Sequence, residues 1–144
     1  MKVSEAMSHD VRIAAPNQTI CDAARLMAEL DTGALPVGDN DRLVGMITDR
    51  DIAIRAVAQH KSPDTHVQDV MSQEVLYCFD DQDVREVARN MGEKQVRRLP
   101  VVNRSKRLVG IVSLADIARE GAAPTQETLS QISKPGGQHS QSTH

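Results

Sequence analysis

Aromatic side chains are almost absent from this 144-residue chain, which has one Tyr, one Phe and no Trp. Its core must therefore be built from aliphatic residues and Met, and a unit of about 60 residues with so few large side chains would be marginally stable alone. Basic charge is also scarce, because 20 acidic residues outnumber 17 basic ones and the net charge is −3. This balance argues against a nucleic-acid-binding surface, which needs clustered Lys and Arg.

Cysteines and long apolar runs are sparse as well. Cys21 and Cys78 are the two cysteines, and they form no CxxC pair. The first ten residues lack the apolar core of a signal peptide, and no apolar run approaches the roughly 20 residues of a membrane span. We expect a soluble, cytoplasmic protein with no membrane association and two reduced, buried thiols, a disulfide between them being the alternative.

Catalytic and metal-binding patterns are missing too. The five histidines lie near one end, in a linker or in the last residues, and none has a cysteine at a zinc-binding spacing. Neither cysteine has a neighbouring base, and the glycine-rich phosphate loops of nucleotide enzymes are absent. The sequence therefore predicts no metal site, no required cofactor and no enzymatic activity.

What the chain does contain is an internal repeat with an offset of about 64 residues. The segment VSEAMS at 3–8 returns as VQDVMS at 67–72. Later matches include LPV at 35–37 with LPV at 99–101. Two copies are too few for a solenoid, so a closed pair is the better interpretation.

The repeat predicts the domain organisation. We expect one domain at 1–60 and a second at 61–121. Residues 122–144 are rich in Gln, Ser, Thr, Gly and Pro, and this composition predicts a polar, disordered tail.

Within each copy, the hydrophobic period alternates between that of strands and that of helices. Ile20, Ala23, Met27 and Leu30, for example, fall on one face of a helix. The pattern predicts an α/β (α+β) fold of two β-α-β-β-α repeats. The expected elements are 11–13, 20–30, 35–37, 43–47 and 51–57 in the first copy, and 75–77, 84–91, 99–102 and 108–112 in the second.

The pattern [ST]-x-x-D occurs where the last strand of each copy gives way to a helix. Thr48 precedes Asp51, and Ser113 precedes Asp116. At this spacing the hydroxyl and the carboxylate share one face of the first helical turn, where backbone N–H groups are free for a phosphate and the acid can hold a ribose diol. A plain helix cap explains the same spacing, so both interpretations stay open.

The copies differ at the residues that precede LPV. Arg97 and Arg98 stand there in the second copy, whereas the first copy has Gly33 and Ala34. Two arginines beside a strand suit phosphate recognition, although a solvated surface pair explains them equally well.

The chain resembles a pair of CBS domains, the Bateman module. The resemblance rests on GALPV at 33–37, LVGMITDRDI at 43–52 and QVRRLPVV at 95–102, and it spans about residues 1–120. The chain is also similar to small stand-alone bacterial proteins of this type, some linked to hypoxic or stress responses.

The resemblance implies two repeats packed with pseudo-twofold symmetry, and two clefts that bind AMP, ADP, ATP, S-adenosylmethionine or NAD(H). It implies that each cleft combines the [ST]-x-x-D of one copy with residues of the other. Site one would use Thr48, Asp51, Val75, Leu76, Val96 and Arg98. Site two would use Ser113, Asp116, Val11, Arg12, Thr32, Gly33 and Ala34.

By the same resemblance, Asp51 would hold the ribose, and Thr48 and Arg98 the phosphate. Site two lacks a counterpart of Arg98, with Arg12 as a substitute, so site one is expected to be the tighter phosphate site. The resemblance further implies a homodimer that involves Ile54 and Val57 of the closing helix, and an effector protein that senses the bound nucleotide. The alternative is a ligand-free structural or stress-response protein that acts through protein contacts.

Overall fold

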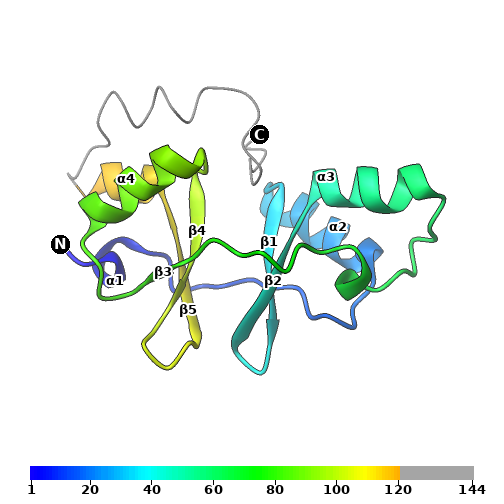
Figure 1. Ribbon diagram of the computed structural model, residues 1–144, viewed down its shortest axis with the longest axis horizontal. Helices are drawn as coiled ribbons and strands as arrows, with labels where there is room; N and C mark the ends of the chain where they lie inside the picture. The colour runs from blue at the N-terminus through cyan, green and yellow to red at the C-terminus, as the bar shows by residue number, and fades with distance from the viewer. Residues whose placement is uncertain (121–144) are drawn as a thin grey trace. The chain divides into compact units, whose positions relative to one another are not determined.

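The computed structural model describes residues 1–120, and the predicted tail at 122–144 lies outside them. The described chain forms two compact units (Figure 1). Of the described residues, unit 1 contains Met1–Val11 and 76–120, and unit 2 is Arg12–Val75. The mixed helix and strand content agrees with the predicted fold class.

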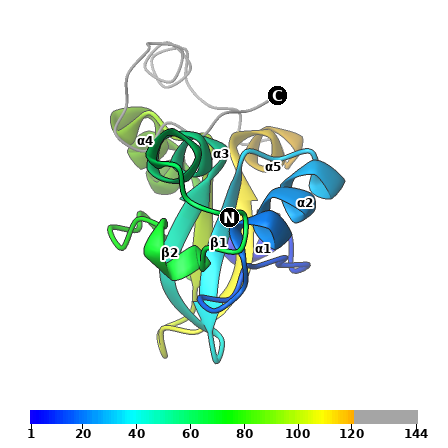
Figure 2. The same cartoon turned by 90° about the vertical axis from the view of Figure 1, so that its right-hand side faces the viewer.

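Unit 2 contains an antiparallel hairpin of β1 (Ala34–Asp39) and β2 (Arg42–Thr48), and Ala14 adds a single parallel bridge to Val37. Helix α2 (Ile20–Leu30) lies along this hairpin (Figure 2). The remaining elements are α3 (Asp49–Asp51), the π-helical turn η1 (Ile52–Ala56), and the 3₁₀ turns η2 (Val57–Gln59) and η3 (Val67–Asp69).

Helix α2 has the bounds that its hydrophobic stripe predicts. The Thr19 side chain accepts a hydrogen bond from the Asp22 backbone N–H at 3.1 Å and caps the first turn. Ile20, Ala23 and Met27 are buried against the unit 2 core, which also contains Leu35, Val37 and Ile47. The core is therefore aliphatic, as the lack of aromatic residues requires.

Unit 1 repeats this plan. Its sheet has the order β3-β4-β5, with β3 parallel to β4 and β4 antiparallel to β5. The core is again formed by aliphatic side chains, together with Met7, Met91 and Cys78. The elements are α1 (Val3–Ala6), β3 (Cys78–Phe79), α4 (Val84–Lys94), β4 (Arg98–Val102), β5 (Leu108–Ser113) and α5 (Leu114–Arg119).

Each unit includes the first segment of the opposite sequence repeat. These exchanged segments are Met1–Val11 in unit 1 and residues 67–75 in unit 2. In unit 1, Ser8 pairs with Ile111 of β5 through two backbone hydrogen bonds of 2.8 and 3.0 Å. In unit 2, Ser72 pairs in the same way with Met46 of β2, at 2.9 Å in both directions. The compact units therefore differ from the predicted limits of 1–60 and 61–121 in the placement of the first 11 residues and of 61–75.

The predicted first strands at 11–13 and 75–77 are wrong. Pairing begins only at Ala14 in unit 2 and at Cys78 in unit 1. Ala14 and Cys78 are buried, whereas the residues just before them belong to the stretches where the chain passes from one unit to the other. In both copies the strand pairing therefore begins directly after the predicted strand rather than within it.

The closing helix of the first copy is present but is not a regular α-helix. It begins at Asp49, two residues before the predicted start, and continues as a π-helical turn over Ile52–Ala56. Ile54 and Val57 are 51% and 66% exposed on it, as expected. The periodicity of apolar residues does not separate a π turn from an α turn over so short a stretch, which explains the difference.

Candidate functional site

The [ST]-x-x-D motif of unit 2 forms a complete capping box at the end of β2. The Thr48 hydroxyl accepts a hydrogen bond from the Asp51 backbone N–H at 3.0 Å. In return, the Thr48 backbone N–H donates to Asp51 Oδ2 at 2.9 Å. The cap predicted from the spacing is therefore confirmed, and it leaves Asp51 Oδ1 outside the reciprocal pair.

The motif of unit 1 repeats this geometry at the end of β5. The Ser113 hydroxyl accepts from the Asp116 backbone N–H at 3.0 Å, and the Ser113 N–H donates to Asp116 Oδ2 at 3.0 Å. The two carboxylates are similarly accessible, with side chains 17% exposed for Asp51 and 15% for Asp116. Each therefore combines a fixed orientation with access from solvent.

The residues that begin β1 and β4 are hydrogen-bonded to the motif that follows each hairpin. In unit 2, the Asp49 N–H donates to the Gly33 carbonyl at 2.9 Å, and Ala34 is paired with Thr48. Residues just before LPV and the capping box therefore share one end of the hairpin.

In unit 1, the Leu114 N–H donates to the Arg97 carbonyl at 3.1 Å in the same way. The register pairs Arg98 with Ser113. The strands thus bring Arg98 to the end of the hairpin that carries the second motif.

An arginine accompanies each motif carboxylate, and the sequence analysis missed both. Arg55 Nε lies 3.8 Å from Asp51 Oδ1, and the Arg119 guanidinium contacts Asp116 Oδ1. Their spacings of four and three residues from the acid are those of neighbours on a helix surface, which is the signal that could have found them.

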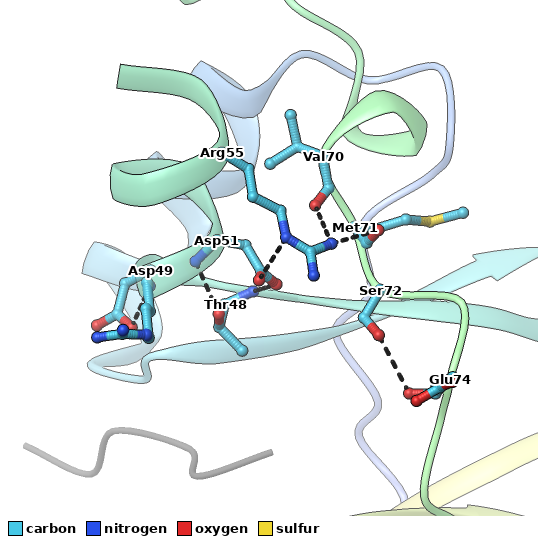
Figure 3. Close-up of polar contacts among 9 residues, drawn as sticks. Thr48, Asp49, Asp51, Arg55, Val70, Met71, Ser72 and Glu74 are labelled. Atoms are coloured by element: carbon cyan, nitrogen blue, oxygen red, sulfur yellow. Dashed lines mark hydrogen bonds and ion pairs between the residues drawn. The ribbon is translucent and has the colours of Figure 1, made fainter. Parts of the chain in front are cut away.

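The Arg55 side chain also reaches the segment that follows η3 (Figure 3). Its Nη1 donates to the carbonyl oxygens of Val70 at 3.4 Å and Met71 at 3.3 Å. One guanidinium therefore joins the motif carboxylate to the backbone of residues 70–71.

The predicted site residues divide between the two units. Thr48 and Asp51 share unit 2 with Val75, while Ser113 and Asp116 share unit 1 with Val11. Unit 2 also contains Arg12, Thr32, Gly33 and Ala34, and unit 1 also contains Leu76, Val96 and Arg98. Both implied sites therefore draw residues from the two units, and their assembly stays a prediction.

Two hollows in unit 2 adjoin these residues. One of about 250 Å³ lies beside the C-terminal half of α2, and its lining includes Thr32, Asp49 and Ile52. Another of about 450 Å³ contains Arg12, which lies 4.0 Å from Glu29. Within the unit, Thr32 therefore adjoins the start of the closing helix, whereas Arg12 lies in the other hollow, beside Glu29 of α2.

The cysteines are free thiols with different surroundings. Cys78 is buried in β3 and donates weakly to the Pro100 carbonyl at 3.8 Å. Burial, together with the nearby Asp80 carboxylate, raises the pKa of the Cys78 thiol to about 12. Cys21 is only half-buried, contrary to expectation, because it lies beside rather than on the buried stripe of α2.

Residues 1–120 contain no group of three or more His, Cys, Asp or Glu side chains arranged to hold a metal ion. In the same part of the chain, no helix combines the length and apolar character needed to cross a bilayer.

The family model of the CBS domain matches residues 3–57 and 67–123, which are the two sequence repeats. The chain belongs to the CBS-domain family. Each CBS repeat ends in one of the capped motifs described above, and the resemblance inferred from the sequence is thereby confirmed.

Small CBS proteins from bacteria are similar to this chain over most of their length. The CBS domain-containing protein YhcV of Bacillus subtilis is 42% identical over 116 residues, which are 81% of this chain and 82% of YhcV. Hypoxic response protein 1 of Mycobacterium tuberculosis is 43% identical over 117 residues, 80% of this chain and 81% of that protein.

Solved CBS structures share the fold. The crystal structure of hypoxic response protein I with two coordinated zinc ions has a TM-score of 0.74 and 40% identity, over 83% of this chain and 98% of that one. CBSX2 in complex with AMP has a TM-score of 0.72 and 27% identity, over 83% and 95% of the chains. The CBS pair of MJ0100 with methylthioadenosine and S-adenosylmethionine has a TM-score of 0.70 and 32% identity, over 84% and 95%.

Proposed function

We propose that this chain is a cytoplasmic regulatory module that binds an adenine nucleotide and signals its presence to a separate effector protein. The observation that carries the proposal is the twice-repeated capping box, in which Asp51 and Asp116 each keep one carboxylate oxygen outside the cap. An ionised oxygen in a fixed orientation is suited to accept hydrogen bonds from a ribose diol. CBSX2 with AMP and MJ0100 with S-adenosylmethionine support this class of ligand.

The proposal assigns Thr48, Asp51, Val75, Leu76, Val96 and Arg98 to one site, and Ser113, Asp116, Val11, Arg12, Thr32, Gly33 and Ala34 to the other. The Asp side chains would hold the ribose, the hydroxyls and Arg98 the phosphate, and the apolar residues the base. A nucleotide can signal only if it binds two states of the module with different affinity. The effector would therefore recognise the state that the nucleotide favours.

We also propose that the module is a homodimer. Leu30 of α2, Ile54 of η1 and Val57 of η2 are exposed large apolar side chains of unit 2. Burial of such side chains against a second copy would be favourable by roughly 1.5 to 3 kcal/mol each. Sedimentation at micromolar concentration should give the mass of a dimer, and a monomer would contradict this part of the proposal.

Calorimetric titration with AMP, ATP and S-adenosylmethionine tests nucleotide binding directly. Asp51→Asn and Asp116→Asn are the useful variants, because Asn keeps a carbonyl oxygen for the cap and loses the negative charge. We expect Asp51→Asn to remove the tighter binding event and Asp116→Asn to affect the weaker one. Absence of binding by the wild type would favour the ligand-free structural or stress-response alternative, and the relative hypoxic response protein 1 is named for a stress response.

Arg98 provides a second test of how the sites are built. The family resemblance assigns it to the phosphate of the Thr48 and Asp51 site, whereas the strand register pairs it with Ser113. Arg98→Ala combined with each Asp variant distinguishes these assignments. Two substitutions in the same site lower its nucleotide affinity non-additively, whereas substitutions in different sites have additive effects. Non-additive loss with Asp51→Asn would support the site proposed above.

A further inference from the structure

Arg55 joins two parts of unit 2 that are distant in sequence. Its Nε lies 3.8 Å from Asp51 Oδ1, and its Nη1 donates to the carbonyl oxygens of Val70 and Met71 at 3.4 and 3.3 Å. In Figure 3 the guanidinium lies between the carboxylate and these carbonyls. A planar group with five N–H donors can serve both partners at once, which an ammonium on a flexible stem does poorly.

The carboxylate partner of Arg55 is held on its other side by the cap. Asp51 Oδ2 accepts from the Thr48 N–H at 2.9 Å, so that Oδ1 is the oxygen that faces Arg55. The wider π-helical turn over Ile52–Ala56 is the local structure that carries Arg55. π turns of this kind occur often at functional sites.

The carbonyl partners belong to a well-anchored segment. Val67 and Val70 are buried in the unit 2 core, and Ser72 is paired with Met46 of β2 through two backbone hydrogen bonds of 2.9 Å. A few residues later the chain leaves unit 2, which ends at Val75. The guanidinium thus contacts the backbone just before one of the points where the two units are joined.

Unit 1 does not repeat this connection. Arg119 is three residues after Asp116 rather than four, and the position equivalent to Arg55 is Glu120. Within residues 1–120, the polar partner of Arg119 is Asp116 on the same helical turn. The link made by Arg55 therefore has no counterpart at Arg119 in the described part of the chain.

We propose that Arg55 is a positioning residue that couples the state of the Asp51 carboxylate to the segment at residues 70–72. A ligand hydroxyl pair bound to Asp51 immobilises the carboxylate, and through it the guanidinium and the two carbonyls. Site occupancy in unit 2 is thereby transmitted to the connection between the units. The ligand-dependent part of this inference rests on the proposed function, whereas the coupling itself does not.

Hydrogen exchange of the backbone amides of Val70, Met71 and Ser72 measures the coupling without ligand. These amides donate to Val67 and Met46 carbonyls, so their exchange reports local opening. We expect Asp51→Asn and Arg55→Lys each to speed their exchange by about three- to tenfold, and the double variant no further than the faster single one. Additive effects, or no effect of Asp51→Asn, would overturn the proposal.

The same amides then test the ligand-dependent part. AMP, ATP and S-adenosylmethionine are the probes, each added at a concentration that saturates the wild type in calorimetry. We expect the bound probe to slow exchange at residues 70–72 about tenfold in the wild type and in Arg42→Lys, a substitution at the other end of β2, but not in Arg55→Lys. Full slowing in Arg55→Lys contradicts the inference. If no probe binds, the proposed function fails while the ligand-free measurement still decides the coupling.

Discussion

The two units use the same backbone plan but different side chains on it. Both have a capping box after the hairpin and an exchanged first segment paired with it. Unit 2 closes with a π-helical turn, and its hairpin tip carries Asp39 and Asp41. Unit 1 closes with the α-helix α5, and its hairpin tip carries Arg104 and Lys106.

The aromatic residues show how far the side chains have diverged. Tyr77 and Phe79, the only aromatics of the chain, both belong to unit 1 and pack edge to face with ring centroids 5.7 Å apart. Arg104 lies 4.1 Å above the Phe79 ring and forms a bidentate pair with Asp81. The capped hairpin and its paired first segment are therefore repeated in both units, whereas the aromatic and cation–π contacts belong to unit 1.

The largest expected difference between the units concerns their thiols. Burial raises the pKa of Cys78 from 9.0 to about 12, which lowers its thiolate fraction about a thousandfold at neutral pH. Cys21 of unit 2 is half-buried. We expect iodoacetamide at pH 8 to label Cys21 and to leave Cys78 unmodified, with peptide mass spectrometry as the readout. Labelling of both thiols at equal rates in the folded protein would contradict the buried position of Cys78.

The same pKa shift makes unit 1 sensitive to alkaline pH. The Cys78 thiol of the unfolded chain loses its proton near 9.0, whereas the folded one keeps it to about 12, so unfolding becomes more favourable as the pH rises through this window. Cys78→Ala, which copies Ala14 of unit 2, is the control. Urea unfolding at pH 8 and pH 10 should show a greater loss of stability in the wild type than in the variant.

The second comparison concerns the glycines of the two LVG segments. A Cβ on Gly110 would lie 2.5 Å from Met7 Sδ and 2.8 Å from the Ser8 carbonyl oxygen, and one on Gly45 would lie 2.7 and 2.8 Å from the equivalent atoms of Met71 and Ser72. Because a backbone carbonyl cannot move freely, we expect Gly110→Ala and Gly45→Ala each to destabilise the protein by about 2 to 3 kcal/mol in urea unfolding.

Gly38→Ala is the matched control for these variants. Its Cβ would meet Ile13 Cδ1 at 2.9 Å, which is the end of a flexible side chain, and the nearest backbone atom is the Arg42 oxygen at 3.6 Å. The loss should therefore be smaller. Equal losses at all three glycines would show that the close approach of the exchanged segments is not what requires Gly45 and Gly110.

The sequence predicted the parts of the fold that depend on local chemistry. The stripe of Ile20, Ala23 and Met27 gave the bounds of α2, and the spacing of Thr48 and Asp51 gave the capping box. It could not give the exchange of first segments, because that depends on which hairpin offers a partner edge in three dimensions. The strands expected at 11–13 and 75–77 were misplaced for this reason.

The same limit applies to the candidate site. The motif acids were found from their spacing, whereas the contacts of Arg55 with Val70 and Met71 were not. These contacts join residues 15 and 16 positions apart, and they depend on the π-helical turn, for which the sequence carries no distinct period. Long-range polar contacts of this type become visible only in the folded chain.

The smallest expected effects come from the capping hydroxyls. Thr48→Ala and Ser113→Ala each remove one acceptor from a capping box and should cost about 1 kcal/mol in urea unfolding. Thr19→Ala, which removes the cap of α2 outside both motifs, should cost about the same.

Stability alone thus does not show whether a motif hydroxyl only caps its helix or also binds the nucleotide, but calorimetric titration does. If the motif hydroxyls also bind phosphate, Thr48→Ala weakens nucleotide binding by about tenfold while Thr19→Ala leaves it unchanged, because one hydrogen bond to a charged group is worth about 1.5 kcal/mol or more. Thr48→Ser, which keeps the hydroxyl, should restore both properties. Equal nucleotide affinity in all of these variants would show that the motif hydroxyls cap their helices and do not bind the nucleotide.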